Sequence, residues 1–166
     1  MSSKVPISRP IAWISLIPQL LFLAVLYYIY YLFAYPEFVI LAPLTFIIIS
    51  ISLRCFVANA HRQGMKLLKQ AKFSEAITAF EKSLDYFTRH KWIDKYRFIT
   101  VLSSSKMTYA EMAMCNIAFC YGQTGDIQES KRYYEIVLER YPGNVIAKTA
   151  LNTINSINKQ HNSGEH

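Results

Sequence analysis

Three cysteines and four histidines are among the side chains of this sequence that could bind a metal or act in catalysis. Cys55, Cys115 and Cys120 lie inside apolar helical patterns and lack the CxxC spacing of zinc sites and redox motifs. Cys115 and Cys120 are five residues apart, which places them on different faces of a helix and argues against a shared metal. We therefore interpret all three as reduced thiols in a protein that faces the cytosol.

The histidines are scattered along the chain and form no ligand pattern: they are His61, His90, His161 and His166. The sequence also contains no GxSxG, HExxH, P-loop or GxGxxG motif. These observations predict that the protein is not an enzyme and that it uses no metal and no cofactor. They favour a function in binding.

Two long uncharged runs occupy the N-terminal third of the chain. Residues 11–35 are long enough to cross a bilayer, which takes about 20 apolar residues. The second uncharged run extends from Phe38 to Leu53; Arg54 at its end can snorkel to the headgroups, and extension through Val57 makes the segment long enough to span. A short turn with Pro36 and Glu37 separates them. We predict two transmembrane helices, at about 11–34 and 38–57, after a short cytoplasmic segment, 1–10. The competing interpretations are a secretory signal peptide, whose apolar core would be only about 7–15 residues long, and a buried helix of a soluble bundle.

Positive charge is concentrated beside these runs. Residues 54–97 contain ten Lys or Arg and four Asp or Glu, whereas residues 98–166 contain six of each. Lys4 and Arg9 precede the first run, and the turn between the runs carries only Glu37. The positive-inside rule then predicts a two-pass integral membrane protein with both termini on the cytoplasmic or equivalent side.

A helix–turn–helix pattern follows in residues 116–142. Apolar residues recur at helical spacing on both sides of Gly125-Asp126. Asp126 is a favourable N-cap, and Glu129 three residues later predicts a capping box. Pro142 with the glycine after it ends the second helix. Such a hairpin cannot bury its own apolar face, so we expect neighbouring helices to cover it.

The hairpin resembles a tetratricopeptide repeat, a 34-residue unit with the pattern W-x2-L-G-x2-Y, A-x3-F and P. The pattern positions are occupied in order by Met114, Ile117, Ala118, Tyr121, Ser130, Tyr134 and Pro142. An upstream copy has Ala60, Gln63, Gly64, Leu67, Ala76 and Phe80 at the matching positions. The resemblance implies an all-α domain, residues 58–160, with repeats at about 57–90 and 111–144.

About 20 residues are inserted between the repeats, because Gly64 and Ala118 are 54 residues apart and the repeat period is 34. The insert, 88–110, either extends both flanking helices or forms a separate short helix at 93–102. We favour extended helices with a break near the serines at 103–105. After the repeats, Asn144 can cap a last helix, 145–159, that covers the terminal apolar face, and residues 161–166 have the composition of a disordered tail.

The resemblance also implies capture of a protein or peptide on the concave face that the first helix of each repeat lines. The positions that would face such a partner are His61, Met65, Lys69, Met112, Cys115, Asn116, Phe119 and Gln123. Asn116 stands where repeats that clamp the carboxylate of chaperone C-termini keep an asparagine. His61 and Met65 replace the lysine and the other asparagine of that clamp, so the clamp is incomplete.

A run of basic and aromatic residues in the insert is the second candidate contact surface. Its members are Arg89, Lys91, Trp92, Lys95 and Arg97. The run could lie on anionic headgroups, bind a protein partner, or form a solvated helix face with Trp92 packed inward. The sequence does not favour nucleic-acid binding, because no recognition motif accompanies the basic residues.

Together, these patterns predict a transmembrane helical hairpin followed by two repeats and a capping helix. The expected function is that of a membrane-anchored scaffold or adaptor that recruits partners or assembles a membrane complex. The main alternative is a structural subunit of such a complex that acts through its transmembrane hairpin, and a remote one is a chaperone-docking co-chaperone. The sequence does not indicate an oligomeric state.

Overall fold

The computed structural model describes residues 16–33, 36–103 and 105–163, with side chains left out at residues 54 and 158–163. Lys4, Arg9 and Trp13 therefore lie outside the described residues, as does the first part of the first apolar run. The described residues divide into two compact units. We call residues 16–59 and 89–108 the hairpin unit, and residues 60–88 and 109–163 the repeat unit.

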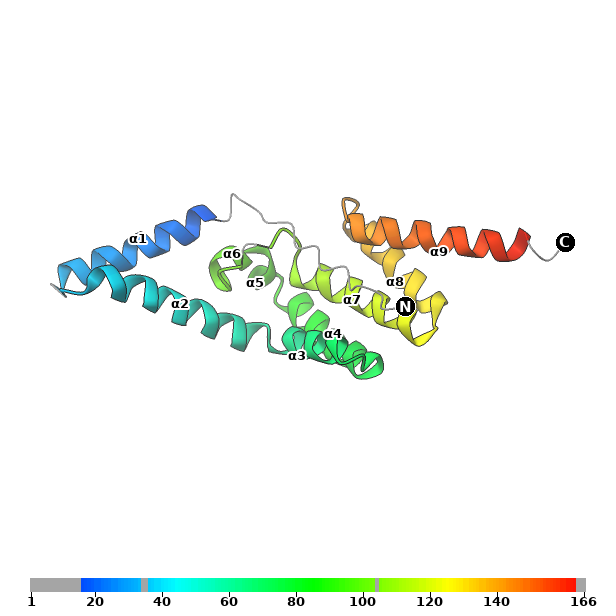
Figure 1. Ribbon diagram of the computed structural model, residues 1–166. Coiled ribbons are helices and arrows are strands. Elements are labelled where there is room, and N and C mark those ends of the chain that lie inside the picture. The colour runs from blue at the N-terminus through cyan, green and yellow to red at the C-terminus, as the bar shows by residue number, and fades with distance from the viewer. Residues whose placement is uncertain (1–15, 34–35, 104, 164–166) are drawn as a thin grey trace. The chain divides into compact units, whose positions relative to one another are not determined.

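The regular structure of the described residues is helical (Figure 1). The hairpin unit contains α1 (Leu16–Leu32), α2 (Phe38–Val57), α5 (Lys91–Lys95) and α6 (Arg97–Thr100). The repeat unit contains α3 (Asn59–Lys69), α4 (Phe73–Arg89), α7 (Tyr109–Thr124), α8 (Ile127–Arg140) and α9 (Val145–Ser163).

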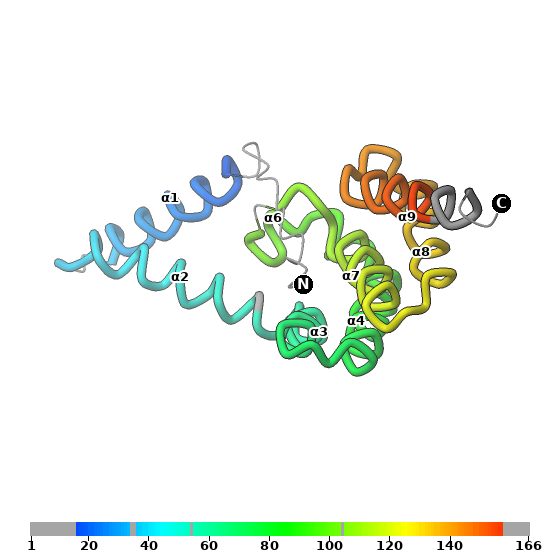
Figure 2. Tube along the Cα trace, turned by 45° about the vertical axis from the view of Figure 1, so that its right-hand side comes forward, coloured from blue at the N-terminus to red at the C-terminus, as the bar shows by residue number. Residues whose placement is uncertain are grey.

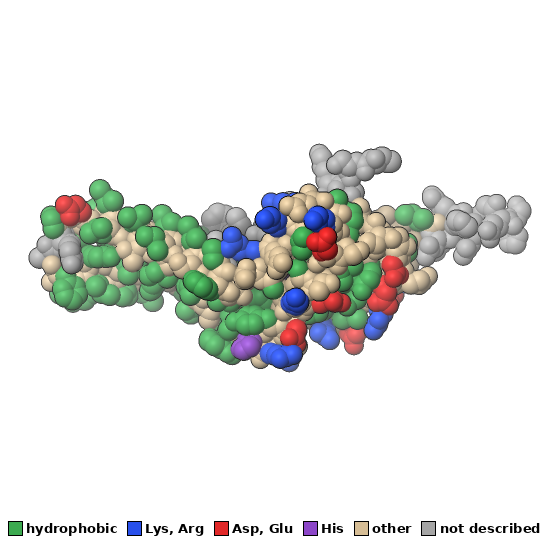
Figure 3. Space-filling view, turned by 90° about the horizontal axis from the view of Figure 1, so that it is seen from below, with side chains coloured by type: hydrophobic (Ala, Val, Ile, Leu, Met, Phe, Trp, Pro, Cys, Tyr) green, Lys and Arg blue, Asp and Glu red, His purple; other side chains and the backbone are tan. Residues whose placement is uncertain are grey.

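Helices α1 and α2 lie side by side and antiparallel, as Figures 1 and 2 both show. The rings of Phe22 and Phe46 meet with their centroids 6.0 Å apart, and the hydroxyls of Tyr30 and Thr45 share a hydrogen bond of 2.7 Å. Among the described residues, α2 is the helix that is long and apolar enough to cross a membrane. Helix α1 is apolar but, over its described residues, shorter. In Figure 3 hydrophobic side chains cover much of α1 and α2, and the visible charged side chains gather mainly over other helices.

A proline inside α2 is compensated by the neighbouring helix. Pro43 has no N–H, so the carbonyl of Val39, four residues earlier, loses its usual helical donor. The hydroxyl of Tyr27 in α1 donates to this carbonyl at 3.2 Å. A freed carbonyl in an apolar hairpin is thus satisfied by the adjacent helix.

The insert between the repeats forms two short helices, so our preference for extended flanking helices is wrong. Helix α4 ends at Arg89 and α7 begins only at Tyr109. Leu102 adopts a positive φ of 48°, which breaks a helical path, and the serine run follows it. The guanidinium of Arg97 donates to the carbonyls of Ser105 and Lys106 at 2.7–3.1 Å and so closes the returning loop.

In the repeat unit, α3 and α4 form a close helical hairpin. Gly64 of α3 lies against the ring of Phe80 in α4: a Cβ on Gly64 would come within 2.7 Å of two ring carbons. The turn places Ala71 at a φ of 57°, and the N–H of Lys72 returns to the carbonyl of Leu67 at 3.0 Å. This left-handed C-terminal turn satisfies carbonyls at the end of α3.

The second hairpin, α7–α8, closes the core. A cluster of buried side chains joins α3, α4 and α7, and its members are Leu68, Ala76, Ile77, Phe80, Ala113, Ile117 and Cys120. Helix α8 packs on α7 through the buried Ser130 and Tyr134, the two pattern positions of its face. Helix α9 packs on α8 and buries Ala147 and Leu151. Ile157, farther along α9, is 58% exposed.

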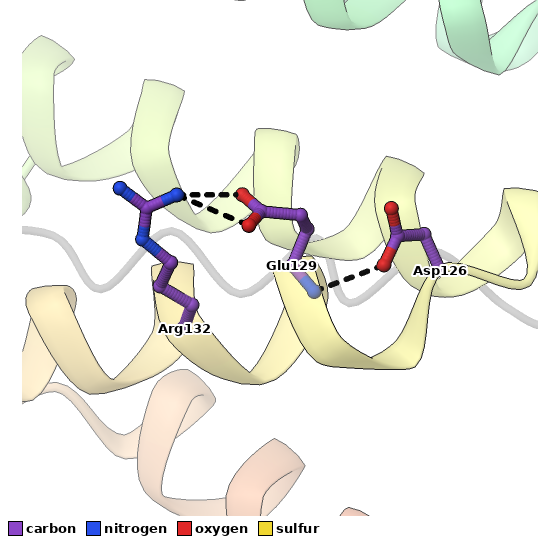
Figure 4. A network of polar contacts seen from close by, with 3 residues as sticks. All are labelled: Asp126, Glu129 and Arg132. Atoms are coloured by element: carbon purple, nitrogen blue, oxygen red, sulfur yellow. Dashed lines mark hydrogen bonds and ion pairs between the residues drawn. The ribbon is translucent and has the colours of Figure 1, made fainter.

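The start of α8 confirms the predicted N-cap but not the full capping box. The carboxylate of Asp126 accepts a hydrogen bond from the N–H of Glu129 at 3.0 Å (Figure 4). The carboxylate of Glu129 turns instead to Arg132, with both oxygens within 3.1 Å of one guanidinium nitrogen. The N–H of Asp126 donates to the carbonyl of Tyr121. Because this backbone acceptor satisfies Asp126, Glu129 is free to form an ion pair one turn along the helix.

Candidate functional site: the face formed by α3 and α7

Helices α3 and α7, which carry the predicted partner-binding residues, contact each other in the structure. Residues 61, 65 and 69 recur along one side of α3, and 112, 116, 119 and 123 recur along one side of α7. The side-chain amide of Asn116 donates to the sulfur of Met65 at 3.5 Å. Met65 and Phe119 also both pack against the buried cluster of the repeat unit. The predicted partner-binding residues of the two helices therefore meet within one unit.

Three of the eight predicted binding residues are buried. His61 is 3% exposed, and its ring lies edge-on to the rings of Phe80 and Tyr109, with centroid distances of 5.4 and 5.3 Å. Met112 and Cys115 are also buried. These side chains shape the core beneath the face, and a ligand on the surface would not reach them directly.

The other five predicted residues reach the surface, and we call them the α3–α7 face. Met65, Asn116 and Phe119 are half-buried, whereas Lys69 and Gln123 are exposed. The face thus combines an aromatic ring, a thioether and an amide at its centre with a cation and a second amide near the helix ends. Such a mixture suits an apolar anchor residue of a partner, flanked by hydrogen bonds.

Behind the face, Asn144, Glu111 and Cys115 form a buried polar junction that the sequence does not predict. The side-chain amide of Asn144 donates to the Glu111 carboxylate at 2.8 Å and to the Cys115 sulfur at 3.5 Å. Its oxygen caps α9 by accepting from the N–H of Ala147 at 2.8 Å. The sequence identified Asn144 as a cap, but its contact with Glu111 joins residues 33 positions apart, which no local pattern reports.

Burial makes the thiols of Cys115 and Cys120, near the face, unreactive. Burial, with a smaller contribution from the charge of Glu111, raises the pKa of Cys115 from 9.0 to about 12, against the lowering effect of the Asn144 hydrogen bond. Burial likewise raises the pKa of Cys120 to about 12. Both groups are therefore neutral thiols at physiological pH. In the part of the chain that the structure describes, no three His, Cys, Asp or Glu side chains come together as a metal site would require.

The predicted basic surface of the insert is placed partly outward and partly inward. Arg89, Lys91, Trp92 and Lys95 are exposed. Arg97 is half-buried, and its guanidinium is engaged by the carbonyls of Asp94, Ser105 and Lys106. Arg97 therefore holds the insert together, and the other four side chains form its outer surface. The interpretation in which Trp92 packs inward is wrong, because its side chain is 60% exposed.

Comparison with known proteins adds one match. No curated protein and no solved structure matches the chain. Residues 113–144, which run from the first turns of α7 through α8 to the cap of α9, match the sequence model of the family described as Tetratricopeptide repeat. This match supports the resemblance of the chain to the tetratricopeptide repeat family, whose repeats generally bind other proteins and are typically not enzymes.

Proposed function

We propose that this protein is a membrane-anchored scaffold whose α3–α7 face binds a protein partner during assembly or recruitment of a membrane complex. The observation that carries the proposal is the contact between Asn116 and Met65, which joins the candidate residues of the two repeats. The repeat match at residues 113–144 supports a role in protein–protein interaction.

The anchor in this proposal is the α1–α2 hairpin, crossing the bilayer twice with both termini on the cytoplasmic or equivalent side. The length and apolar character of α2 support a membrane span. The hydroxyl of Tyr27 on the carbonyl of Val39 supports pairing of α1 with α2 in an apolar medium, where an unsatisfied carbonyl would be costly. Only Ala58 separates α2 from α3 in the chain, so no linker segment would lie between the anchor and the repeats in the sequence.

The partner is expected to present an apolar side chain between hydrogen-bonding groups. Phe119 and Met65 offer an apolar contact, and Asn116 and Gln123 offer amides that both donate and accept. Lys69, exposed at the end of α3, would favour an acidic residue in the same segment of the partner.

The proposal is tested by site-specific photo-crosslinking in native membranes. A photoreactive amino acid replaces Phe119 in one variant and Gln123 in a second, and the matched control carries it at Thr149, which is exposed on α9. We expect a discrete protein adduct from both probe positions and none from the control. The exposed substitution Lys69→Glu, combined with the Gln123 probe, should weaken the adduct several-fold without loss of helix content.

Absence of an adduct from both positions, in protein that is folded and inserted, would contradict the proposal. Strong adducts from a probe at Tyr28, which is 62% exposed on α1, would instead support the second candidate, a structural subunit that acts through its transmembrane hairpin. The specific observation in favour of that candidate is the row of exposed aromatic and aliphatic side chains on both α1 and α2. Replacing the hairpin by an unrelated two-helix anchor separates the two functions, because a scaffold would keep its partner and a structural subunit would lose it.

A further inference from the structure

The outer surface of the insert is aromatic and apolar where a solvated loop would be polar. Trp92, Tyr96 and Ile99 are 60%, 46% and 56% exposed. They follow one another at intervals of four and three residues, and backbone hydrogen bonds from Tyr96 to Trp92 and from Thr100 to Tyr96 keep the path nearly helical across the junction of α5 and α6. The three side chains therefore share one face. We call them the outer face of the insert.

Other apolar side chains of the insert are buried. Ile93, Val101 and Leu102 are at most 9% exposed, and the hydroxyl of Thr100 fixes the fold of the segment by donating to the carbonyl of Ile93 at 2.8 Å. The insert has thus already used one apolar face for its own packing. Its second apolar face stays exposed, although the Tyr96 ring also meets the Phe98 ring edge-on with centroids 6.3 Å apart, and large exposed aromatic side chains of this kind mark contact surfaces.

Basic side chains surround the outer face. Residues 89–108 of the insert contain five Lys or Arg and a single acidic residue, Asp94, which is buried. Arg89, Lys91, Lys95 and Lys106 are exposed, and the ammonium of Lys95 lies 5.6 Å from the centroid of the Tyr96 ring. Segments that lie in the headgroup region of a membrane are typically rich in aromatic residues and lysines.

The position of the insert within its unit points to the same surface. Helix α6 packs on α1. Figure 1 shows α5 and α6, and Figure 2 shows α6, at the end of the hairpin where α1 begins and α2 ends, opposite the connecting turn. If the hairpin spans a bilayer, that end emerges at the face where the positive-inside rule places basic residues. The outer face is then continuous with the region where the two apolar helices leave the hydrocarbon core.

We propose that the outer face of the insert binds the anionic headgroup surface of the membrane that the hairpin spans. Trp92 and Tyr96 lie at the headgroup level, and Lys91 and Lys95 pair with lipid phosphates. This inference rests on the anchoring part of the proposed function. It gives the insert a role that the repeats themselves do not need, which is to fix the hairpin unit at the membrane surface by a third contact beside its two helices.

The test measures the depth of Trp92 in lipid vesicles. The chain has two tryptophans, so Trp13→Phe leaves Trp92 as the only tryptophan reporter in the full-length protein. The variant is reconstituted into pure lipid vesicles, either neutral phosphatidylcholine alone or with an anionic lipid added. Quenching is compared between nitroxide lipids labelled at the headgroup or deep in the acyl chain and water-soluble acrylamide.

In anionic vesicles we expect strong quenching by the headgroup label, weaker quenching by the deep label, and protection from acrylamide. Neutral vesicles should give less protection. Each exposed lysine near an anionic surface contributes a factor of about five to association, so Lys91→Gln with Lys95→Gln should shift the surface equilibrium by roughly 25-fold and restore access of acrylamide. The charge-matched control, Lys82→Gln with Lys148→Gln, alters two exposed lysines of the repeat unit and should change nothing.

The inference is wrong if acrylamide quenches Trp92 and neither lipid label does, in protein that remains in the vesicles after alkaline carbonate. That result would still agree with the proposed membrane anchor. Protection that is found in native membranes but not in pure lipid vesicles identifies a protein on this surface and overturns the inference as well. Extraction of the protein by carbonate is a different failure. It removes the proposed anchor, and with it the basis of the inference.

Discussion

Tyr27 in α1 donates its hydroxyl to the backbone carbonyl of Val39 in α2, with 3.2 Å between the two oxygens. Val39 is the residue whose helical donor is missing, because Pro43 stands four positions later. One side chain thus compensates for a defect in the neighbouring helix. It also ties the two helices in one relative register.

This relationship predicts coupling between Tyr27 and Pro43. On the proposed membrane insertion of the hairpin, Tyr27→Phe should lower the free energy of unfolding in detergent micelles by about 0.6 kcal/mol, the average for a hydrogen bond between membrane helices. Pro43→Ala returns an N–H to the Val39 carbonyl, so Tyr27→Phe should cost little in that background. A thermodynamic cycle of the four proteins measures the coupling. Tyr28→Phe, at an exposed position of the same helix, is the control, and equal costs of Tyr27→Phe in both backgrounds would refute the coupling.

Gly64 is predicted to tolerate no side chain. In Gly64→Ala the new Cβ would lie 2.7 Å from two carbons of the Phe80 ring, which is itself fully buried. Overpacking of this kind costs about 1–3 kcal/mol, and we expect a matching fall in the urea midpoint followed by circular dichroism. Gly143→Ala is the control, since no atom lies within 4 Å of its added Cβ. A second substitution, Phe80→Leu, should recover part of the loss in Gly64→Ala by making room.

Asn144 is predicted to be more important than an ordinary helix cap. Asn144→Ala removes the acceptor for the N–H of Ala147 and the amide that donates to the buried carboxylate of Glu111. The expected cost is about 2–3 kcal/mol, because the loss of a cap and of a donor to a buried charge add together. Asp126→Ala, at the solvent-exposed cap of α8, should cost about 1 kcal/mol. Equal effects of the two substitutions in urea denaturation would show that the junction with Glu111 contributes nothing.

Cys115 and Cys120 are predicted to resist alkylation in the folded protein. In the Cys55→Ser variant they are the only thiols, and their pKa values of about 12 keep them protonated at pH 8. Mass spectrometry after treatment with iodoacetamide should find neither modified until guanidinium is added. Rapid modification of the native protein would contradict the buried placement.

The same pKa shifts predict a loss of stability at alkaline pH. A thiol with a pKa raised from 9.0 to about 12 by folding stabilises the folded state fully below pH 9 and progressively less as the pH rises toward 12. The urea midpoint should therefore fall between pH 8 and pH 10. When Cys115 and Cys120 are both replaced by Ala, the fall in the urea midpoint should be smaller because the two thiols no longer contribute. Some fall should remain, because burial also raises the pKa of Tyr134.

Local sequence determined where α8 and α9 begin. Asp126 and Asn144 were identified as caps from their own type and from the residues around them, and each caps its helix through an N–H three residues ahead. The apolar run also predicts α2, because a segment of this length with a charge only near its end favours one long helix. Caps and apolar runs are decided within one or two helical turns, so the chain itself carries the information.

Tertiary structure decided which side of each helix is available. His61 stands at a position expected to face a partner, yet the rings of Phe80 and Tyr109, 19 and 48 residues later, enclose it. The insert was expected as two extended helices, but the guanidinium of Arg97 collects carbonyls from a returning loop and makes a separate element. Burial and long-range hydrogen bonds depend on which distant segments fold back against a helix. Periodicity along one helix reports that it has an apolar face, and only packing determines what covers it.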